Sequence, residues 1–288
     1  MTTETTTETN PLLQALNSLG FVYEVRTSTR GTAYAGLRWE SVPARGLRAF
    51  TALYESGALR LTLHAPLGAG ARLDAAARLE RVAALPLVRL ERGEEDPEAS
   101  QLALAVPLDA ADVTPALVRA LLAYLASAGD RLVADEHDGA GALAWPAVAG
   151  APGATFVERA LAYLELGAHP GRGGAHLIEM PLPGLGAPGA FSVTTADAGW
   201  VRVEAWLLRG SALTRTRADD ELVDRLQLWA PVGRFVRLAR DGAEQLAVEV
   251  AAPLVGERPE DALAQVLRGA VQLLGTAYQQ AQAAGVRS

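Results

Sequence analysis

The sequence contains no cysteine and no lysine, and only 6% of its 288 residues are aromatic. Without cysteine the chain can form no disulfide, no thiolate metal site and no cysteine nucleophile. No apolar run approaches the length of about 18 residues that marks a membrane-spanning helix. These absences predict a cytoplasmic protein with no transmembrane segment and no thiol chemistry.

The charge pattern is acidic overall, with a net charge of −7, and every basic residue is an arginine. Arginine is nowhere concentrated without interleaved acids, which disfavours non-specific binding to nucleic-acid phosphates. The coding bias of a GC-rich genome explains an arginine-only chain more simply than phosphate recognition by arginine does. Direct contact with nucleic acid is therefore not expected.

The length and composition allow two ordinary domains, because half of the residues are apolar and each half can bury a core. Residues 1–10 are rich in threonine and glutamate and are predicted to form a disordered tail. Residues 136–153 are rich in Gly, Ala and Pro without a period, which is typical of a linker. The predicted domains are 11–135 and 154–288, and within the linker 139–153 is expected to be the most protease-sensitive internal segment.

Two segments repeat one order of strand, turn, strand, proline and helix. In the first, Val88-Arg89-Leu90 leads to an apolar strand ending at Pro107. In the second, Val236-Arg237-Leu238 leads to an apolar strand ending at Pro253. Because both segments even share Val-Arg-Leu, the sequence predicts one α+β unit written twice.

Hydrophobic periodicity predicts the same elements in each half: helix, three antiparallel strands, helix, two strands, helix. The expected ranges in the first half are 11–19, 34–40, 48–54, 58–64, 70–85, 87–90, 102–106 and 115–128, with residues 21–26 merely extended. Those in the second half are 155–166, 176–180, 191–195, 200–208, 216–229, 235–240, 246–252 and 260–282. Since the strands are joined by short loops, we expect a largely antiparallel sheet with helices on one face.

This element order, with a long amphipathic helix last, resembles the fold shared by type III secretion chaperones and the YbjN-like proteins of bacteria. The strand pairs and prolines above carry the resemblance, as does Leu19-Gly20-Phe21 followed by Tyr23-Glu24-Val25. The resemblance covers almost the whole chain, twice. It implies a small module that binds other proteins and has no catalytic residues. Such chaperones act as dimers, which leaves open whether the two copies mimic a dimer within one chain or the chain dimerises further.

The sequence predicts no catalytic, cofactor-binding or metal-binding residue. His169 and His176 flank a glycine-rich loop, 167–174, that fixes no ligand geometry. That loop follows a helix and precedes a strand, which is the wrong orientation for a phosphate-binding loop. The acidic run 135–138 lies at the edge of the linker, where nothing rigid holds it, and no serine sits in a nucleophile elbow.

The strand 200–208 carries the candidate binding surface. Val201 and Val203 alternate with larger side chains, so if the valines meet the helices the other face of the sheet is open. That face holds the candidate protein-binding residues, namely Trp200, Arg202, Trp206 and Leu208. Two alternatives are that the copies pack these faces together and that the alternation is assigned one residue out.

The function predicted from the sequence is that of a non-enzymatic, protein-binding adaptor or chaperone-like protein built from two YbjN-like repeats. Its expected partner is a protein of unknown identity, a homodimer is a further option, and no membrane is involved. One alternative is a nucleic-acid-associated accessory protein, which requires a basic surface. Another is an enzyme with an unrecognised site.

Overall fold

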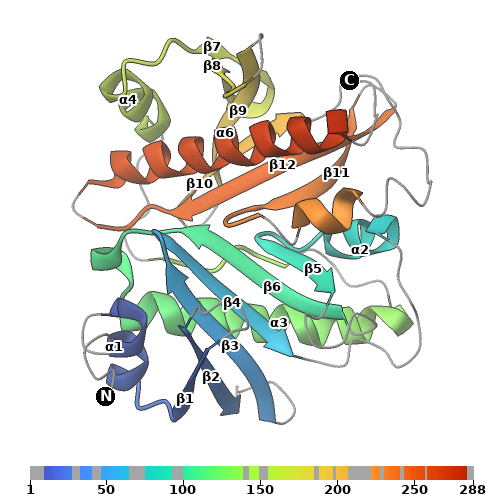
Figure 1. The fold of residues 1–288 in the computed structure, drawn as a ribbon. Helices are drawn as coiled ribbons and strands as arrows, with labels where there is room; N and C mark the ends of the chain where they lie inside the picture. The colour runs from blue at the N-terminus through green and yellow to red at the C-terminus, as the bar shows by residue number, and fades with distance from the viewer. Residues whose placement is uncertain are drawn as a thin grey trace.

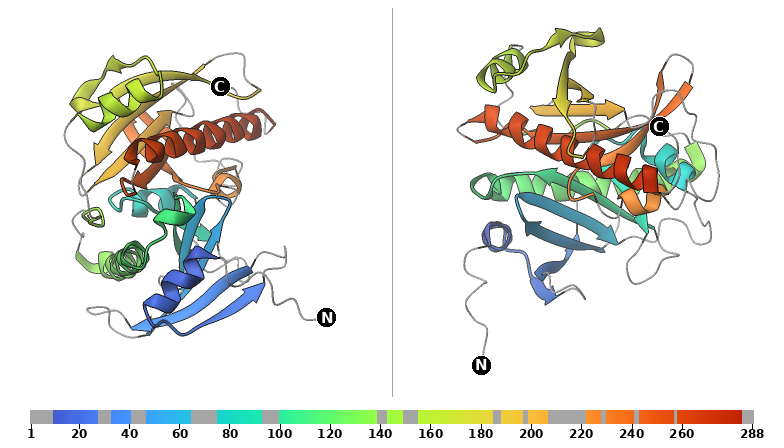
Figure 2. Two further views of the ribbon diagram at one scale, coloured as in Figure 1. Left: turned by 90° about the vertical axis from the view of Figure 1, so that its left-hand side faces the viewer. Right: turned by 45° about the horizontal axis from the view of Figure 1, so that its top comes forward.

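Two six-stranded antiparallel sheets form an α+β fold (Figure 1). The computed structural model describes residues 10–27, 33–40, 47–64, 75–92, 100–138, 143–148, 155–184, 188–196, 199–206, 222–227, 230–240, 243–256 and 258–283. In both views of Figure 2 the second half of the chain lies above the first. Within the described residues no helix is both long and apolar enough to span a bilayer.

The first half contains one of the sheets, in the order β1-β2-β3-β4-β6-β5. Its elements are α1 (Pro11–Ser18), β1 (Tyr23–Thr27), β2 (Ala33–Glu40), β3 (Leu47–Glu55), β4 (Ala58–His64), α2 (Ala75–Val82), β5 (Val88–Arg92), β6 (Ser100–Pro107), a 3-10 turn (Ala110–Asp112) and α3 (Pro115–Asp138). Asn10 caps α1 by accepting hydrogen bonds from the backbone of Leu12 and Leu13, and Pro11 opens the helix, as its sequence predicts.

The second half contains the other sheet, in the order β7-β8-β9-β10-β12-β11. Its elements are α4 (Phe156–Tyr163), β7 (His169–Pro170), a 3-10 turn (Arg172–Gly174), β8 (His176–Pro181), β9 (Pro188–Ala196), β10 (Trp200–Trp206), a helical segment at 222–227, β11 (Arg234–Arg240), β12 (Ala243–Pro253) and α6 (Pro259–Ala283). Counted from the first strand of each half, the two strand orders are the same.

The expected run of three strands per half is wrong, because each sheet has a fourth strand at its outer edge. β1 pairs with β2 along five residues, and β7 pairs with β8 through His169 and Pro170. β1 lies in the segment predicted only as extended, and the short β7 lies in the segment predicted as the loop 167–174. Such edge strands bury little apolar surface, so the hydrophobic pattern gives them a weak signal.

The third helix is also longer than predicted, and it changes the predicted linker. α3 continues to Asp138, so the acidic run 135–138 forms its last turn instead of the start of a linker at 136. Gly129 lies inside this helix without ending it. A Cβ atom at Gly129 would come within 2.6 Å of the Leu63 side chain, so glycine permits a close approach of helix and sheet.

The first helix of each half ends in the same way. The backbone N–H groups of Gly20 and Phe21 donate to the carbonyls of Asn17 and Leu16. In α4 the corresponding bonds lie 145 positions later, from residues 165 and 166 to residues 162 and 161. Gly20 has a φ of 72°, a left-handed conformation that glycine adopts without strain, whereas Glu165 holds a φ of 56° with a side chain.

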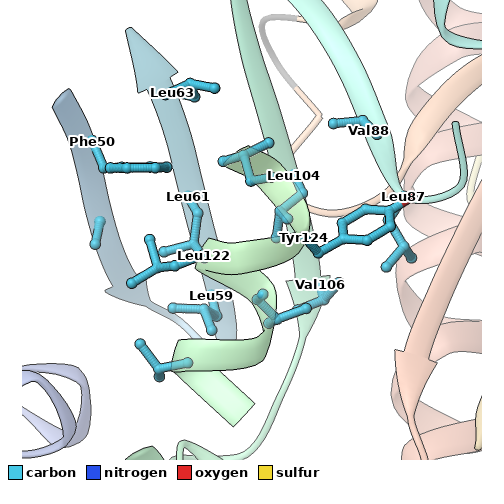
Figure 3. Close-up of a cluster of buried hydrophobic side chains, with 14 of the residues drawn as sticks. Phe50, Leu59, Leu61, Leu63, Leu87, Val88, Leu104, Val106, Leu122 and Tyr124 are labelled. Carbon is cyan, nitrogen blue, oxygen red and sulfur yellow. The ribbon is translucent and has the colours of Figure 1, made fainter. Parts of the chain in front are cut away.

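The apolar core of each half lies between its sheet and its long helix. In the first half, Leu59, Leu61 and Leu63 of β4 face Leu122 of α3 (Figure 3). In the second, the stripe on α6 that includes Leu267 covers the valines of β10. The inward position of Val201 and Val203 agrees with the sequence prediction, since both are fully buried.

Each core also contains a residue from the other half. Leu79 of α2 belongs to the core of the second half, and Trp200 of β10 belongs to the core of the first. Residues 143–148 of the predicted linker pack against the core of the first half, where Trp200 lies. Trp145 packs on Trp200 with 5.7 Å between ring centroids, and the Trp200 indole N–H donates to the carbonyl of Pro146 at 2.7 Å. This part of the linker is therefore packed against the seam between the halves.

Candidate functional site: the seam and the second open face

A fully buried arginine of the first half reaches into the second half. The Arg89 guanidinium on β5 donates from Nη1 to the carbonyl of Gly233 at 2.6 Å and from Nη2 to that of Ala230 at 3.0 Å. Its Nε donates to Glu91 at 2.5 Å. Burial lowers the pKa of Arg89, and the neighbouring Glu91 carboxylate opposes that shift. The arginine stays cationic because its ordinary pKa is very high.

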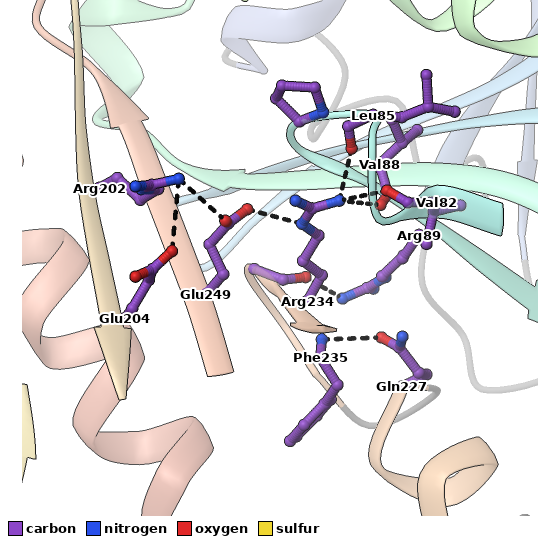
Figure 4. A network of polar contacts seen from close by, with 12 residues as sticks. Val82, Leu85, Val88, Arg89, Arg202, Glu204, Gln227, Arg234, Phe235 and Glu249 are labelled. Carbon is purple, nitrogen blue, oxygen red and sulfur yellow. Dashed lines mark hydrogen bonds and ion pairs between the residues drawn. The ribbon is translucent and has the colours of Figure 1, made fainter. Parts of the chain in front are cut away.

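A buried arginine of the second half makes the reciprocal contacts. Arg234 on β11 donates from Nη1 to the carbonyls of Leu85 at 2.5 Å and Val88 at 3.0 Å, both in the first half (Figure 4). It also reaches the carbonyl of Val82 at 3.0 Å. Its Nε donates to Glu249 at 2.7 Å. Each arginine thus donates to backbone carbonyls that lie before or at the start of a strand in the other half. That strand is β11 for Arg89 and β5 for Arg234.

The spacing of these contacts is that of a two-fold interface. Leu85, Val88 and Arg89 lie 145 positions before Ala230, Gly233 and Arg234, respectively, as the sequence numbering shows. In a symmetric dimer, residue i of one copy contacts residue j of the other, and j contacts i. Arg89 and Arg234 meet this condition within one chain.

The sheet register corrects the correspondence that the sequence suggested. Arg89 pairs with Ala103, which lies four residues before Pro107, and Arg234 pairs with Glu249, which lies four residues before Pro253. Arg237 is the arginine of the shared Val-Arg-Leu. It lies three residues after Arg234 on β11 and pairs with Leu246 instead. The matching motif is therefore three residues out of register with the structural match.

Each seam arginine belongs to a triad of two arginines and a glutamate, in which the second arginine is partly exposed. In the first half Glu91 also binds Arg60 of β4, and in the second the carboxylate of Glu249 lies 3.7 Å from Arg202 of β10. Arg60 and Arg202 occupy the same position in their sheets, since they pair with Ala105 and Ala251. A guanidinium that binds several acceptors at once offsets the cost of burying its charge.

The structure places the four sequence-predicted binding residues in different surroundings. Trp200 is fully buried in the first half's core, so it is not part of a surface that a partner can reach. The physical reason is the segment at Trp145, which covers that end of β10. Arg202 and Trp206 are partly exposed, and Leu208 lies outside the described residues.

The open face of the second sheet also carries a residue that sequence reasoning missed. Leu177 of β8 is 44% exposed and pairs with Ser192, which in turn pairs with Glu204 of β10. Side chains two apart on a strand share a face, so Leu177 lies on the same face as Arg202 and Trp206. The alternation of Leu177 with the buried Ile178 was the signal that could have identified it.

Two charges on β10 are paired with each other. Arg202 lies 3.4 Å from Glu204 and 3.7 Å from Glu249 at the seam. Burial raises the pKa of Glu204, while Arg202 opposes that shift. The face therefore presents the partly exposed Trp206 together with the exposed Leu177 and Glu179 of β8.

The two histidines weighed as metal ligands lie on neighbouring strands of the second sheet. No group of three or more His, Asp or Glu side chains in the described part of the chain could hold a metal ion. His169 lies on β7 and His176 on β8, where the residue beside each across the hairpin is Leu177 and Pro170, respectively.

Comparison with known proteins gives little further identification. No family model and no curated protein matches the chain. Among solved structures, YbjN from E. coli matches with 14% identity over 46% of this chain and 92% of that chain, with a TM-score of 0.35. The di-domain ARO/CYC StfQ from the steffimycin biosynthetic pathway matches with 12% identity over 95% of this chain and 96% of that chain, with a TM-score of 0.18. Both TM-scores lie below 0.5.

Proposed function

We propose that the chain is a fused pair of YbjN-like, chaperone-like units that acts as a non-catalytic, cytoplasmic protein-binding adaptor. The reciprocal arginine contacts support the fusion, because Arg89 and Arg234 bind across the seam as the two copies of a symmetric dimer would. The equal strand orders of the two sheets support it as well.

The single observation that carries the binding role is the partly apolar open face of the second sheet. Leu177 of β8 is 44% exposed there, and Trp206, two strands away on the same face, is partly exposed. Tryptophan is enriched at binding hot spots. On the first sheet, His64 occupies the position of Trp206. The preceding residues, Leu63 and Ala205, pair with Leu102 and Val248, which hold the same place in their strands. We therefore propose that the face with Trp206 on the second sheet binds the protein partner and that the face with His64 on the first sheet does not.

The test compares Trp206→Ala with His64→Ala in the full chain. Both variants should fold, which circular dichroism checks, because both side chains are partly or fully exposed. Proteins captured from the native cell are identified by mass spectrometry, and the affinity of each purified candidate is then measured. We expect Trp206→Ala to weaken binding by at least about tenfold, corresponding to the loss of a hot-spot residue, and His64→Ala to leave it unchanged. Equal binding by wild type and Trp206→Ala would place the surface elsewhere.

A further inference from the structure

The outer edge of the first sheet differs from the other sheet edges in the described residues. β5 and β11 approach each other at the seam, and α2 contacts both. β7 has only two residues and ends in Pro170, which has no N–H to donate. β1, by contrast, is five residues long and lies at the end of its sheet farthest from the second sheet (Figure 1).

β1 also carries exposed apolar side chains beside its charged ones. Val25 is 48% exposed, and Val22, just before the strand, is 88% exposed. An antiparallel edge strand presents a row of unpaired N–H and C=O groups on its outer side. Such an edge accepts another strand through main-chain hydrogen bonds, with side chains setting the specificity.

The charges on β1 are complementary to the same strand turned around. Glu24 and Arg26 are two residues apart, so they share one face, with Val25 between them on the other. In an antiparallel pair centred on Val25, Glu24 lies opposite Arg26 of the other strand, and Arg26 lies opposite Glu24. Opposite charges directly across an antiparallel pair are stabilising, and like charges there are destabilising.

We propose that β1 pairs with β1 of a second copy of this chain, antiparallel and about a two-fold axis at Val25. Within one chain Arg26 Nη2 donates to Glu24 at 2.7 Å, and both side chains are more than 60% exposed. Pairing between copies exchanges the two intrachain contacts, one in each copy, for two contacts across the axis. The dimer joins two first sheets into one continuous sheet and carries its two second halves at opposite ends.

The occupant of the edge is a second copy because the strand is its own charge complement. The interface is small, since it consists of two five-residue strands and their flanking valines, so a weak, concentration-dependent dimer is expected. β1 and the face with Trp206 lie on different sheets, so the two surfaces are separate.

The experiment measures self-association of the full chain by analytical ultracentrifugation from about 1 to 200 µM, the range in which weak interfaces associate. Wild type should dimerise within it. Glu24→Arg and Arg26→Glu should each weaken the dimer by about tenfold or more, since both cross-strand pairs become like-charged. An equimolar mixture of the two variants should associate again, because the two arginines of the first variant then face the two glutamates of the second.

Two controls separate the edge from other causes. Glu55→Arg places the same charge change at an exposed site of the same sheet and should leave the dimer unchanged. Circular dichroism and thermal melting confirm that the variants fold. A wild type that stays monomeric to the highest concentration overturns the proposal. A dimer that neither single charge swap weakens also overturns it. If Trp206→Ala abolishes that dimer, the interface is the open face of the second sheet instead.

Discussion

In the first half of the molecule, Glu91 on the same strand neutralises Arg89, whereas in the second half Glu249, on the neighbouring strand, neutralises Arg234. The arginines and their carbonyl acceptors occupy equivalent positions in the two halves, but the carboxylates do not. A carboxylate can reach the same guanidinium from either strand. From the positions of Arg89 and Arg234 the guanidinium reaches backbone carbonyls across the seam, and both halves have an arginine there.

Away from the seam the two halves differ more. His64 of the first sheet stands where the second has Trp206, and the five-residue edge strand β1 stands where the second half has the two-residue β7. Glu165 holds the left-handed turn that Gly20 holds in the first half. The reciprocal arginine contacts are thus common to both halves, whereas these positions away from the seam differ.

The largest expected effect comes from breaking one core to see whether the other follows. Leu267→Asp should unfold the second half, because the buried leucine contributes about 1.5–3 kcal/mol and an unpaired buried carboxylate costs several more. Since Leu79 and Trp200 each lie in the other half's core, the first half should melt in the same transition. Leu121→Asp, at a fully buried position of α3, is the matched variant.

Thermal melting followed by circular dichroism and by tryptophan fluorescence checks this prediction. Coincident curves support one cooperative unit. An unchanged melt for Leu267→Asp would show that this face of α6 is not core, and two separate transitions would show that the halves fold independently.

The next effect tests whether the two seam arginines are equivalent. Arg234→Ala and Arg89→Ala should each destabilise the protein by about 3–5 kcal/mol, because each leaves a buried glutamate and several carbonyls without their donor. Urea denaturation measures both. Arg38→Ala, at an exposed position on β2, should cost less than about 0.5 kcal/mol. A seam variant as stable as this control would contradict the role of the reciprocal arginine contacts.

A smaller effect sharpens the comparison of the helix ends. Gly20→Ala should cost about 1 kcal/mol, because alanine is strained at a φ of 72°. Glu165→Gly should gain about 0.5–1 kcal/mol by relieving the same strain in the second half. Denaturation midpoints that shift in opposite directions are the expected result, and two losses would mean that the Glu165 side chain has a compensating contact.

The smallest effect concerns pH at one sheet position, where the second half has Glu204 and the first half has Thr62. The pKa of Glu204 is raised from its ordinary value of 4.5, chiefly by burial. The folded protein therefore holds this proton more tightly than the unfolded chain, and the associated stability is lost as pH rises from 4.5 through the folded pKa. Glu204→Gln removes that loss.

Melting temperatures of wild type and Glu204→Gln between about pH 4 and pH 8 check this. The variant should gain on wild type by about 1–2 °C as pH rises. Thr62→Ser in the first sheet should show no such trend. A variant that instead loses ground at neutral pH would mean that the contact of Glu204 with Arg202 outweighs burial.

The sequence by itself determined the elements that bury an apolar face. The stripe that includes Leu267 on α6 and the alternation of Val201 and Val203 on β10 predicted the helix and the strand correctly. They did so because burial of one face imposes a period of 3.6 or 2 on the chain. The edge strands β1 and β7 were not predicted as members of a sheet, since an edge strand with one or both faces in solvent carries no strong period.

The tertiary structure alone decided what covers each face. The sequence placed Trp200 correctly on the face opposite Val201, yet only the packing of Trp145 shows that this end of the face is closed. It also offered Arg237 as the counterpart of Arg89 by motif, while the sheet register selects Arg234. Local patterns record which side of a strand avoids water, but contacts between residues about 145 positions apart depend on register and on how the halves dock, which no short-range pattern encodes.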